Sequence, residues 1–482
     1  MQYSAVVTTG IYCRPDCSAR PDAANVRSYA SAAAAEAAGF RACLRCRPYR
    51  STSAGGPISA TATELVCRAT HLISEGALDE RTEADLAALV GVSGRHLRRL
   101  FIEHVGATPD GLARSRRTHF ARRLLDDTDL TVTDIAYASG FGSARQLHRA
   151  CLEVFQAAPT DLRARRRKAD RLPTDDLATD GGLTLRLPVE GPLDWALLLG
   201  YFARRAVAGV EHVADGVYRR TIVVDGDPGV IELRDGGPGV VLLTVHLPTV
   251  AGLIHVVERA RRIFALDRDP REANAVLADD PVLGAQVAAR PGLRVPGTWD
   301  PLETGVRAIV GQQVSVAGAS TVMGRIVERV GTPVPGLVPF GLRHTFPDAG
   351  TLARADLTAI GMPGARATAI TAFAAAVDKG EVPLDGRLGL DDLVEALCSV
   401  RGLGPWTAHY LALRMGESDA FPVGDLGLRR AAAPVGSGPL SAAELATRSE
   451  PWRPHRGLAA LRLWLSEDQS GSLPSALRPT FQ

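Results

Sequence analysis

Four cysteines close to the N-terminus constrain this chain more than any other feature of its sequence. Cys13 and Cys17 are separated by three residues, and Cys43 and Cys46 by two. Two close pairs of thiolates at this spacing are typical of tetrahedral zinc. The start of the chain lacks the basic and apolar segments of a secretory signal, so we expect a cytoplasmic protein whose paired cysteines bind metal. The sequence therefore predicts Zn²⁺ on these four residues, in a module of residues 1–50.

The chain is long enough for three or four domains, because 482 residues far exceed the usual size of one. Hydrophobic residues make up 46% and charged residues 22%, which excludes global disorder. No uncharged apolar run reaches the length of a membrane span. The net charge of +2 says little about partners, since a basic half can be masked by an acidic one. Polar, turn-forming segments at 51–57 and 165–182 predict linkers, and the basic start of the second is expected to extend a helix.

The residues around the cysteines are more specific than their spacing. Thr8-Thr9-Gly10-Ile11-Tyr12 precedes Cys13, and Gly39-Phe40-Arg41 lies just before Cys43. Over about residues 4–50 the sequence resembles the zinc domain of the Ada family of methylphosphotriester repair proteins. The resemblance implies that Cys13 is both a zinc ligand and a methyl acceptor, although a purely structural zinc site remains an alternative. The chain also begins closer to this motif than other members of the family do.

Residues 57–168 contain two similar units, 82–105 and 131–155, each with a helix, a glycine turn, a serine and a second helix. These are helix-turn-helix patterns, and the pair resembles the DNA-binding domain of AraC-type activators. The resemblance implies binding to promoter DNA and contact with RNA polymerase. Outward candidates for base contacts are Arg99 and Arg145, together with His96 and His148. A plain helical bundle with solvated arginines is the alternative.

Arginines are dense in the first of these units. Eight lie between positions 91 and 123, against only Glu103 and Asp110. Such a local excess of positive charge predicts contact with DNA phosphates. Two further cysteines, Cys67 and Cys151, have apolar helical surroundings and are expected in the core.

The region 183–295 changes character. Alternating apolar and polar residues at 218–224 and 240–246, split by Gly and Pro turns, predict a small antiparallel sheet. Apolar periodicity predicts flanking helices at 193–208 and 250–265.

Residues 296–475 return to helical periodicity, with a glycine-rich hairpin at 400–408 and a Pro/Gly segment at 421–428 that ends in an Asp before a new helix. This combination resembles the helix-hairpin-helix DNA glycosylases, and within them the AlkA family over about 183–466. The resemblance implies that Asp425 is the catalytic carboxylate and that Gly402 and Gly404 face the DNA backbone. It also implies a pocket for a flipped, alkylated base whose aromatic lining is Trp406, Tyr410, Trp464 and Tyr201.

Alternatives and departures accompany this resemblance. An Asp before a helix is usually an N-cap, and buried tryptophans are usually core residues. Gln313 stands where the family has an apolar wedge, and Leu426 replaces an aromatic beside Asp425, so both are expected to shape substrate binding. Trp406 occupies the position of the lysine nucleophile of lyase-type relatives, which predicts base removal without strand cleavage.

Together these features predict a multidomain, mainly α protein with a small α+β domain. The predicted domains are a zinc module (1–50), a double helix-turn-helix bundle (57–168), a TBP-like antiparallel sheet domain (183–295) and a helix-hairpin-helix glycosylase domain (296–475). The predicted function is alkylation repair and regulation: excision of alkylated purines such as 3-methyladenine from double-stranded DNA by a monofunctional glycosylase II. A methylphosphotriester methyltransferase and a transcriptional activator share the chain. The alternative is a regulator whose glycosylase-like half is inactive.

Overall fold

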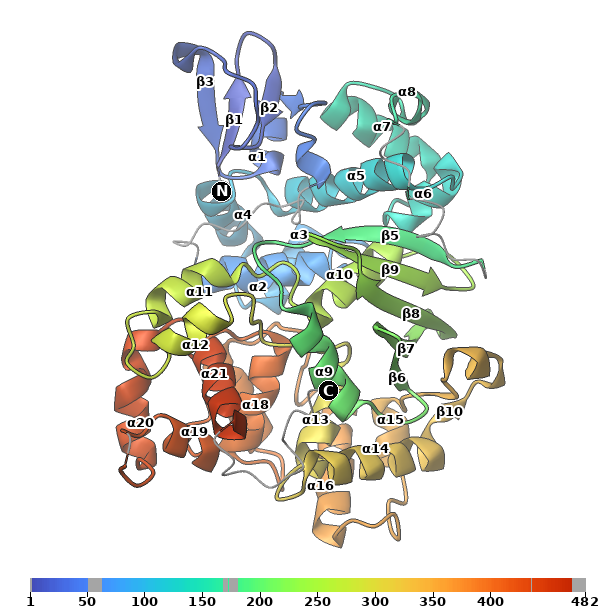
Figure 1. Ribbon diagram of the computed structural model, residues 1–482. Helices are drawn as coiled ribbons and strands as arrows, with labels where there is room; N and C mark the ends of the chain where they lie inside the picture. Colours follow the sequence, from blue (N-terminus) through green and yellow to red (C-terminus); the bar gives the residue numbers. More distant parts are fainter. Residues whose placement is uncertain (1, 51–62, 168–171, 173–180, 435, 470–482) are drawn as a thin grey trace. The chain divides into compact units, whose positions relative to one another are not determined.

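The computed structural model describes residues 2–50, 63–167, 172, 181–434 and 436–469 (Figure 1). Tertiary contacts divide the chain into two compact units. The first comprises Met1–Pro188, Leu247–Arg259 and Asp385–Arg387, and the remainder forms the second. The four predicted domains are a finer division and stay a prediction. The predicted linker at 51–57 and most of the one at 165–182 lie outside the described residues.

The first unit begins with a four-stranded sheet of order β3-β1-β2-β4. β1 is antiparallel to β2 and β3, whereas β2 and β4 are parallel. Ser31 caps helix α1 by accepting a hydrogen bond from the Ala34 amide. The elements are β1 (Tyr3–Val6), β2 (Ile11–Cys13), η1 (Ala23–Asn25), β3 (Val26–Tyr29), α1 (Ala32–Ala37), β4 (Arg41–Ala42) and η2 (Pro48–Arg50).

A helical bundle follows in the same unit. Two predicted turns are confirmed: Gly91 and Gly140 have positive φ, and Ser93 and Ser143 cap the second helix of each pair. Its helices are α2 (Glu64–Ser74), α3 (Glu83–Leu89), α4 (Gly94–His104), α5 (Pro109–Asp127), α6 (Val132–Ala138), α7 (Ala144–Phe155) and α8 (Pro159–Ala164). The expected helical extension after Arg165 is wrong, because α8 ends at Ala164.

The cysteine-bearing sheet and the bundle share a buried polar contact on α5. The Tyr12 hydroxyl donates to Glu36 Oε1 at 2.6 Å, and His119 Nε2 lies 2.6 Å from the same oxygen. Nearby, the Tyr49 hydroxyl donates to Asp126, which is buried and pairs with Arg122 at 2.7 Å. These bonds cross from the zinc module to the longest helix of the bundle, so the two parts form one packed body.

The predicted antiparallel sheet is present in the second unit. Strands β6 (Glu211–Ala214), β7 (Val217–Val224), β8 (Asp227–Asp235) and β9 (Val240–His246) follow one another in space as β9-β8-β7-β6. The β7–β8 hairpin pairs Val224 with Asp227 around a tight turn. The two predicted helices appear as α9 (Trp195–Arg205) and α10 (Leu253–Ile263), both within the expected ranges. Strand β5 (Leu183–Pro188) ends the first of the three segments that make up the first unit.

The rest of the second unit is mainly helical. Its core gathers Val306, Ile309, Met323 and Phe373, all completely buried. Gly305 allows α13 and α16 to approach, because a Cβ there would lie 2.4 Å from the Phe373 ring. The elements are α11 (Pro270–Leu277), α12 (Gly284–Ala289), α13 (Pro301–Val310), α14 (Val316–Val330), β10 (Thr332–Pro333), η5 (Pro335–Phe340), β11 (His344–Thr345), α15 (Ala349–Ala353), α16 (Gly364–Asp378), α17 (Leu390–Cys398), α18 (Pro405–Met415), α19 (Leu426–Ala431), α20 (Ala442–Ser449), η6 (Glu450–Trp452) and α21 (Arg456–Gln469).

Two features bear on the sequence expectations. Cys151 is buried as expected, but the prediction for Cys67 is wrong: this residue is exposed on α2. Among the described residues, no helix is long and apolar enough to cross a lipid bilayer.

Candidate active site and zinc centre

Asp425 begins helix α19 and is both an N-cap and a pocket residue. Its Oδ1 accepts the Leu428 backbone amide at 2.9 Å, which is the ordinary capping bond. The same carboxylate also accepts two indole N–H groups, from Trp406 at 2.7 Å and from Trp464 at 3.1 Å. Since each oxygen has a fixed N–H donor, the carboxylate is held in one orientation.

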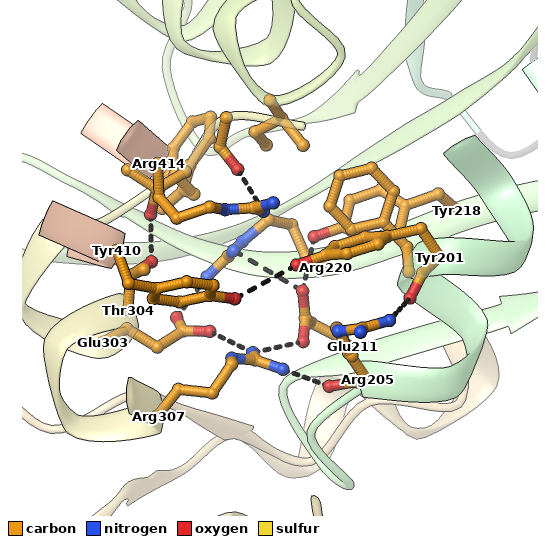
Figure 2. Close-up of a pocket in the computed structure, with 15 residues that line it drawn as sticks. Tyr201, Arg205, Glu211, Tyr218, Arg220, Glu303, Thr304, Arg307, Tyr410 and Arg414 are labelled. Atoms are coloured by element: carbon orange, nitrogen blue, oxygen red, sulfur yellow. Dashed lines mark hydrogen bonds and ion pairs between the residues drawn. The ribbon is translucent and has the colours of Figure 1, made fainter. Parts of the chain in front are cut away.

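The aromatic residues predicted for the pocket come together. Trp406 and Tyr410 lie one turn apart on α18 and stack with ring centroids 5.4 Å apart and an interplanar angle of 7°. Tyr410 also approaches Trp464 of α21 at 6.3 Å. From α9, the hydroxyl of Tyr201 lies 3.3 Å from that of Tyr410 (Figure 2). Thus four aromatic side chains, distant in sequence, surround one space.

That space is a cavity of about 360 Å³, within the range of small-molecule sites, roughly 300–1,000 Å³. Asp425 and the four aromatic side chains all line it. Its other walls are mostly apolar, including Val295, Val314 and Leu461. A flat aromatic ligand therefore finds stacking surfaces and one carboxylate in the same cavity.

Two predicted substrate-binding residues do not line this cavity. Gln313 is exposed in the loop between α13 and α14 and adopts a left-handed backbone, with φ of 55°. Leu426 is 46% exposed at the first position of α19. Neither residue is therefore placed to contact a base inside the cavity. Any role for them in substrate binding lies outside it.

Sequence reasoning missed the arginines of the cavity wall. Arg205, Arg307 and Arg414 line it together with the predicted residues. The Arg307 side chain is anchored by Glu211 and Glu303, both at 2.9 Å (Figure 2). No spacing pattern marks these arginines, and arginine is ordinarily a surface residue, so the sequence carried no signal for them.

The predicted glycine hairpin joins α17 to α18. Gly402 has a φ of 93°, and a Cβ there would lie 2.5 Å from the Ala369 Cβ, so both backbone and packing require glycine. Gly404 is the N-cap of α18, and a Cβ at this position would meet nothing within 4 Å. The amides at this helix start are thus open to an approaching phosphate.

The four cysteines of the N-terminal module form one cluster. Their Sγ atoms all lie within 4.8 Å of one another. That spacing suits four sulfurs around one tetrahedral ion with metal–sulfur bonds of about 2.3 Å. Hydrogen bonding from Cys13 lowers the pKa of Cys46. The donor set fits Zn²⁺, which holds all four sulfurs as thiolates when bound.

In the helix-turn-helix region three of the four outward candidates for base contacts are exposed. Arg99 on α4 and Arg145 on α7 are exposed, as is His148, whereas His96 is half-buried. Part of the predicted phosphate footprint is engaged within the protein. Five of its eight arginines pair with carboxylates of their own unit, namely Arg98, Arg114, Arg116, Arg117 and Arg122. Arg116 and Arg122 are also buried, so they serve packing rather than DNA.

Comparison with known families gives four consecutive matches. Residues 2–49 match the metal binding domain of Ada, and residues 86–165 match a helix-turn-helix domain. Residues 184–300 match the AlkA N-terminal domain, and residues 306–454 match the HhH-GPD superfamily of base excision DNA repair proteins.

Individual proteins extend this result. A probable bifunctional transcriptional activator/DNA repair enzyme AlkA of Mycobacterium tuberculosis is 40% identical over 95% of this chain and 92% of its own. DNA-3-methyladenine glycosylase 2 of Escherichia coli is 35% identical over 57% of this chain and 95% of its own. A solved 3-methyladenine DNA glycosylase from Archaeoglobus fulgidus has the same fold over 60% of this chain and 100% of its own, with 22% identity and a TM-score of 0.53.

The cavity, the hairpin and the carboxylate therefore define a helix-hairpin-helix DNA glycosylase, carried on one chain with a zinc module and a helix-turn-helix regulator. The chain belongs to the family of bifunctional transcriptional activator/DNA repair enzymes that join Ada-type and AlkA-type parts.

Proposed function

We propose that the chain excises alkylated purines such as 3-methyladenine from DNA, with Asp425 as the catalytic carboxylate. The supporting observation is that Asp425 lines an aromatic cavity while two indole N–H groups fix its orientation. When the glycosidic bond breaks, its electron pair leaves with the base and positive charge develops at C1′ of the deoxyribose. A preorganised carboxylate stabilises that charge. Water then forms the new C1′–O bond and loses a proton, for which the carboxylate has free lone pairs.

An alkylated purine that is already cationic leaves as a neutral base, so no acid is needed. The rings of Trp406, Tyr410 and Trp464 would stack on such a base, worth roughly 1–2 kcal/mol where water is excluded. The test is release of 3-methyladenine from alkylated DNA by the whole chain, and its loss in Asp425→Asn. If the wild type releases no base, the inactive-scaffold alternative holds.

The reaction should stop at the abasic site. A lyase needs an amine nucleophile, but the chain has only two lysines, Lys168 and Lys379. Lys379 is exposed at the end of α16 and does not line the cavity, and Lys168 lies outside the described residues. Borohydride should therefore trap no protein–DNA adduct, and strand breaks should appear only after alkali. A trapped adduct would contradict simple base removal.

For the zinc module we propose methyl transfer from a DNA methylphosphotriester to Cys13. Backbone N–H groups bond three of the sulfurs: Arg14 to Cys46 at 3.5 Å, Arg45 to Cys43 at 3.3 Å, and Ala19 to Cys17. Among the described residues, no backbone N–H donates to the Cys13 sulfur, which favours Cys13 as the nucleophile of the four. In the transfer an S–C bond forms, the methyl C–O bond breaks and its electron pair restores a phosphodiester anion.

Intact mass after exposure to methylphosphotriester DNA tests this transfer. A gain of one methylene is expected, mapped to Cys13 and absent in Cys13→Ala. Cys67→Ala is the matched control, because Cys67 is an exposed thiol outside the cluster. An unmodified mass would leave the module as a structural zinc site. Since the cluster must stay reduced, we propose the cytoplasm as its location.

Transfer removes one negative charge from the cysteine cluster, so DNA affinity should rise. We propose that this promotes promoter binding through Arg99 and Arg145, with RNA polymerase as the partner. A salt-matched promoter titration before and after methylation tests the first step, and co-sedimentation with RNA polymerase tests the second.

A further inference from the structure

Tyr201 is in an unusual environment for a tyrosine that lines an aromatic pocket. The Arg205 guanidinium lies 3.9 Å from its ring centroid and that of Arg414 lies 4.7 Å away. Its hydroxyl lies 3.3 Å from that of Tyr410, as Figure 2 shows. Within the described residues neither Arg205 nor Arg414 has a carboxylate within ion-pair distance. The phenol is thus surrounded by positive charge that no acidic side chain directly neutralises.

Charged and titratable groups from several elements lie around this phenol. The surrounding groups are Arg204 and Arg205 of α9, Glu211 of β6, Tyr218 and Arg220 of β7, Glu303 and Arg307 of α13, Tyr410 and Arg414 of α18, and Asp425 at α19. The carboxylates of Glu211 and Glu303 already form ion pairs with Arg220 and Arg307. Positive charge at the cavity wall therefore exceeds negative charge.

This excess is a problem for a pocket that takes cationic bases. Arg205, Arg307 and Arg414 line the same cavity as the base-stacking rings, and like charges in a dry site repel strongly. Burial alone would raise the pKa of Tyr201, but the charges of Arg414, Arg205 and Arg307 and the hydrogen bond with Tyr410 outweigh it and lower this pKa to about 8. For Tyr410, burial and the neighbouring Tyr201 raise the pKa to about 12, so Tyr410 keeps its proton and donates.

We propose that Tyr201 is the charge-selecting residue of the base pocket: as a phenolate, with the guanidinium groups of Arg205 and Arg414 against its ring and the Tyr410 hydroxyl bonded to its oxygen, it favours cationic alkylated purines over neutral ones. The phenolic proton leaves to solvent, and the oxyanion offsets one positive charge of the wall. A neutral base gains nothing from this anion. The inference rests on the proposed excision at Asp425, and it adds a group that senses the charge of the base.

The first test measures ionisation directly and needs no substrate. Phenolate has its own ultraviolet absorbance, so the full chain is titrated from about pH 6 to about pH 10. One tyrosine should titrate near pH 8, and Tyr201→Phe should lack that step. The matched control is Tyr218→Phe. Tyr218 belongs to the same buried region but does not line the base cavity, and burial raises its pKa well above the ordinary value. If the step survives Tyr201→Phe, the proposal is wrong.

The second test uses single-turnover release with excess protein. For DNA carrying cationic 3-methyladenine, the wild-type rate should rise about five- to tenfold through pH 8, and in Tyr201→Phe it should stay near the low-pH value. Neutral 1,N6-ethenoadenine should show no such rise in either protein, and Tyr218→Phe should behave as the wild type. Identical profiles for the wild type and Tyr201→Phe would overturn charge selection. Absence of any release by the wild type would instead overturn the proposed excision, while the absorbance test would still decide the state of Tyr201.

Discussion

Two aspartates of the second unit accept similar hydrogen bonds, and one of them, Asp425, lines the aromatic cavity. Asp280 accepts the Trp452 indole N–H at 2.8 Å and the backbone amides of Val282 and Leu283. Asp425 likewise accepts indole N–H groups and one backbone amide. Asp280, however, also pairs with Arg448 at 2.6 Å, and its side chain is only 6% exposed.

The difference between the two aspartates shows what makes a carboxylate available for chemistry. Fixed N–H donors orient both groups equally well, so orientation is not the distinction. The charge of Asp280 is neutralised by an ion pair with Arg448. Asp425 has no ion-pair partner within the described residues and lines a cavity. A carboxylate that will meet a developing cation must keep its charge unpaired.

The largest expected difference between the two aspartates is in the rate of base release, measured after each carboxylate is neutralised in turn. Asp425→Asn should lower the single-turnover rate of 3-methyladenine release by about a thousandfold, as expected for a preorganised electrostatic group. Asp280→Asn should leave that rate within about twofold at a temperature where it is folded. Gel or chromatographic quantification of released base decides. Comparable losses in both variants would mean that the site depends on the fold and not on the open carboxylate.

Stability should respond in the opposite order. Asp280→Asn leaves Arg448 without its partner in a nearly closed site, and we expect a loss of about 2–4 kcal/mol in the free energy of unfolding. Asp425→Asn keeps a side-chain oxygen for capping and should cost about 1 kcal/mol or less. Urea denaturation of both variants, followed by circular dichroism, measures this. A larger loss for Asp425→Asn would reverse the comparison.

The indole donors provide a finer comparison. Trp464→Phe removes one N–H from Asp425 and should lower the rate about tenfold through looser orientation. Trp452→Phe removes the equivalent donor from Asp280 and should reduce stability by about 1 kcal/mol with an unchanged rate. Both variants keep a ring in place, so packing is nearly conserved. Rate and unfolding measurements on the same two preparations give the result.

The smallest expected effect is on the stability of the protein at acidic pH. Burial alone would raise the pKa of Asp280, but hydrogen bonds from Arg448, Trp452 and two backbone amides outweigh it and lower this pKa. A carboxyl whose pKa is lowered in the folded state stabilises the fold above its unfolded pKa, and this contribution is lost as pH falls through the folded value. Between about pH 5 and about pH 3 the wild type should therefore lose more stability than Asp280→Asn does. Parallel acid dependence in the two proteins would exclude this role.

The structure brings Asp425, Trp406 and Tyr410 to one cavity, and the sequence could name them because each is tied to a local motif. Asp425 follows a Pro/Gly segment, and Trp406 and Tyr410 share one helix face after the glycine hairpin, so their spacing alone brings them together. The cysteine cluster was predictable for the same reason. Arg205 and Arg414 were not, because they meet only when α9 and α18 pack around Tyr201.

The limits of the sequence reasoning have a common cause as well. The phosphate footprint was inferred from arginine density, but density cannot reveal that Arg116 pairs with Glu258, a residue far away in sequence. Cys67 was placed in the core from its apolar neighbours, yet it lies on the exposed side of α2. Tertiary pairing and helix rotation decide these cases, and neither is visible in local composition.

The contacts of α1 with the helical bundle determine how the molecule can be divided. Gly106 lies so close to Ala34 that a Cβ there would lie 2.6 Å from the alanine Cβ, and the Ser31 hydroxyl donates to the Val105 carbonyl at 2.7 Å. Cutting the chain after residue 50 would separate Glu36 from His119 and leave each of these buried side chains without its hydrogen-bond partner. A fragment for crystallography or spectroscopy should consequently run from the first strand through α8. Removing the metal with a chelator should lower the stability of the helix-turn-helix bundle together with that of the zinc module.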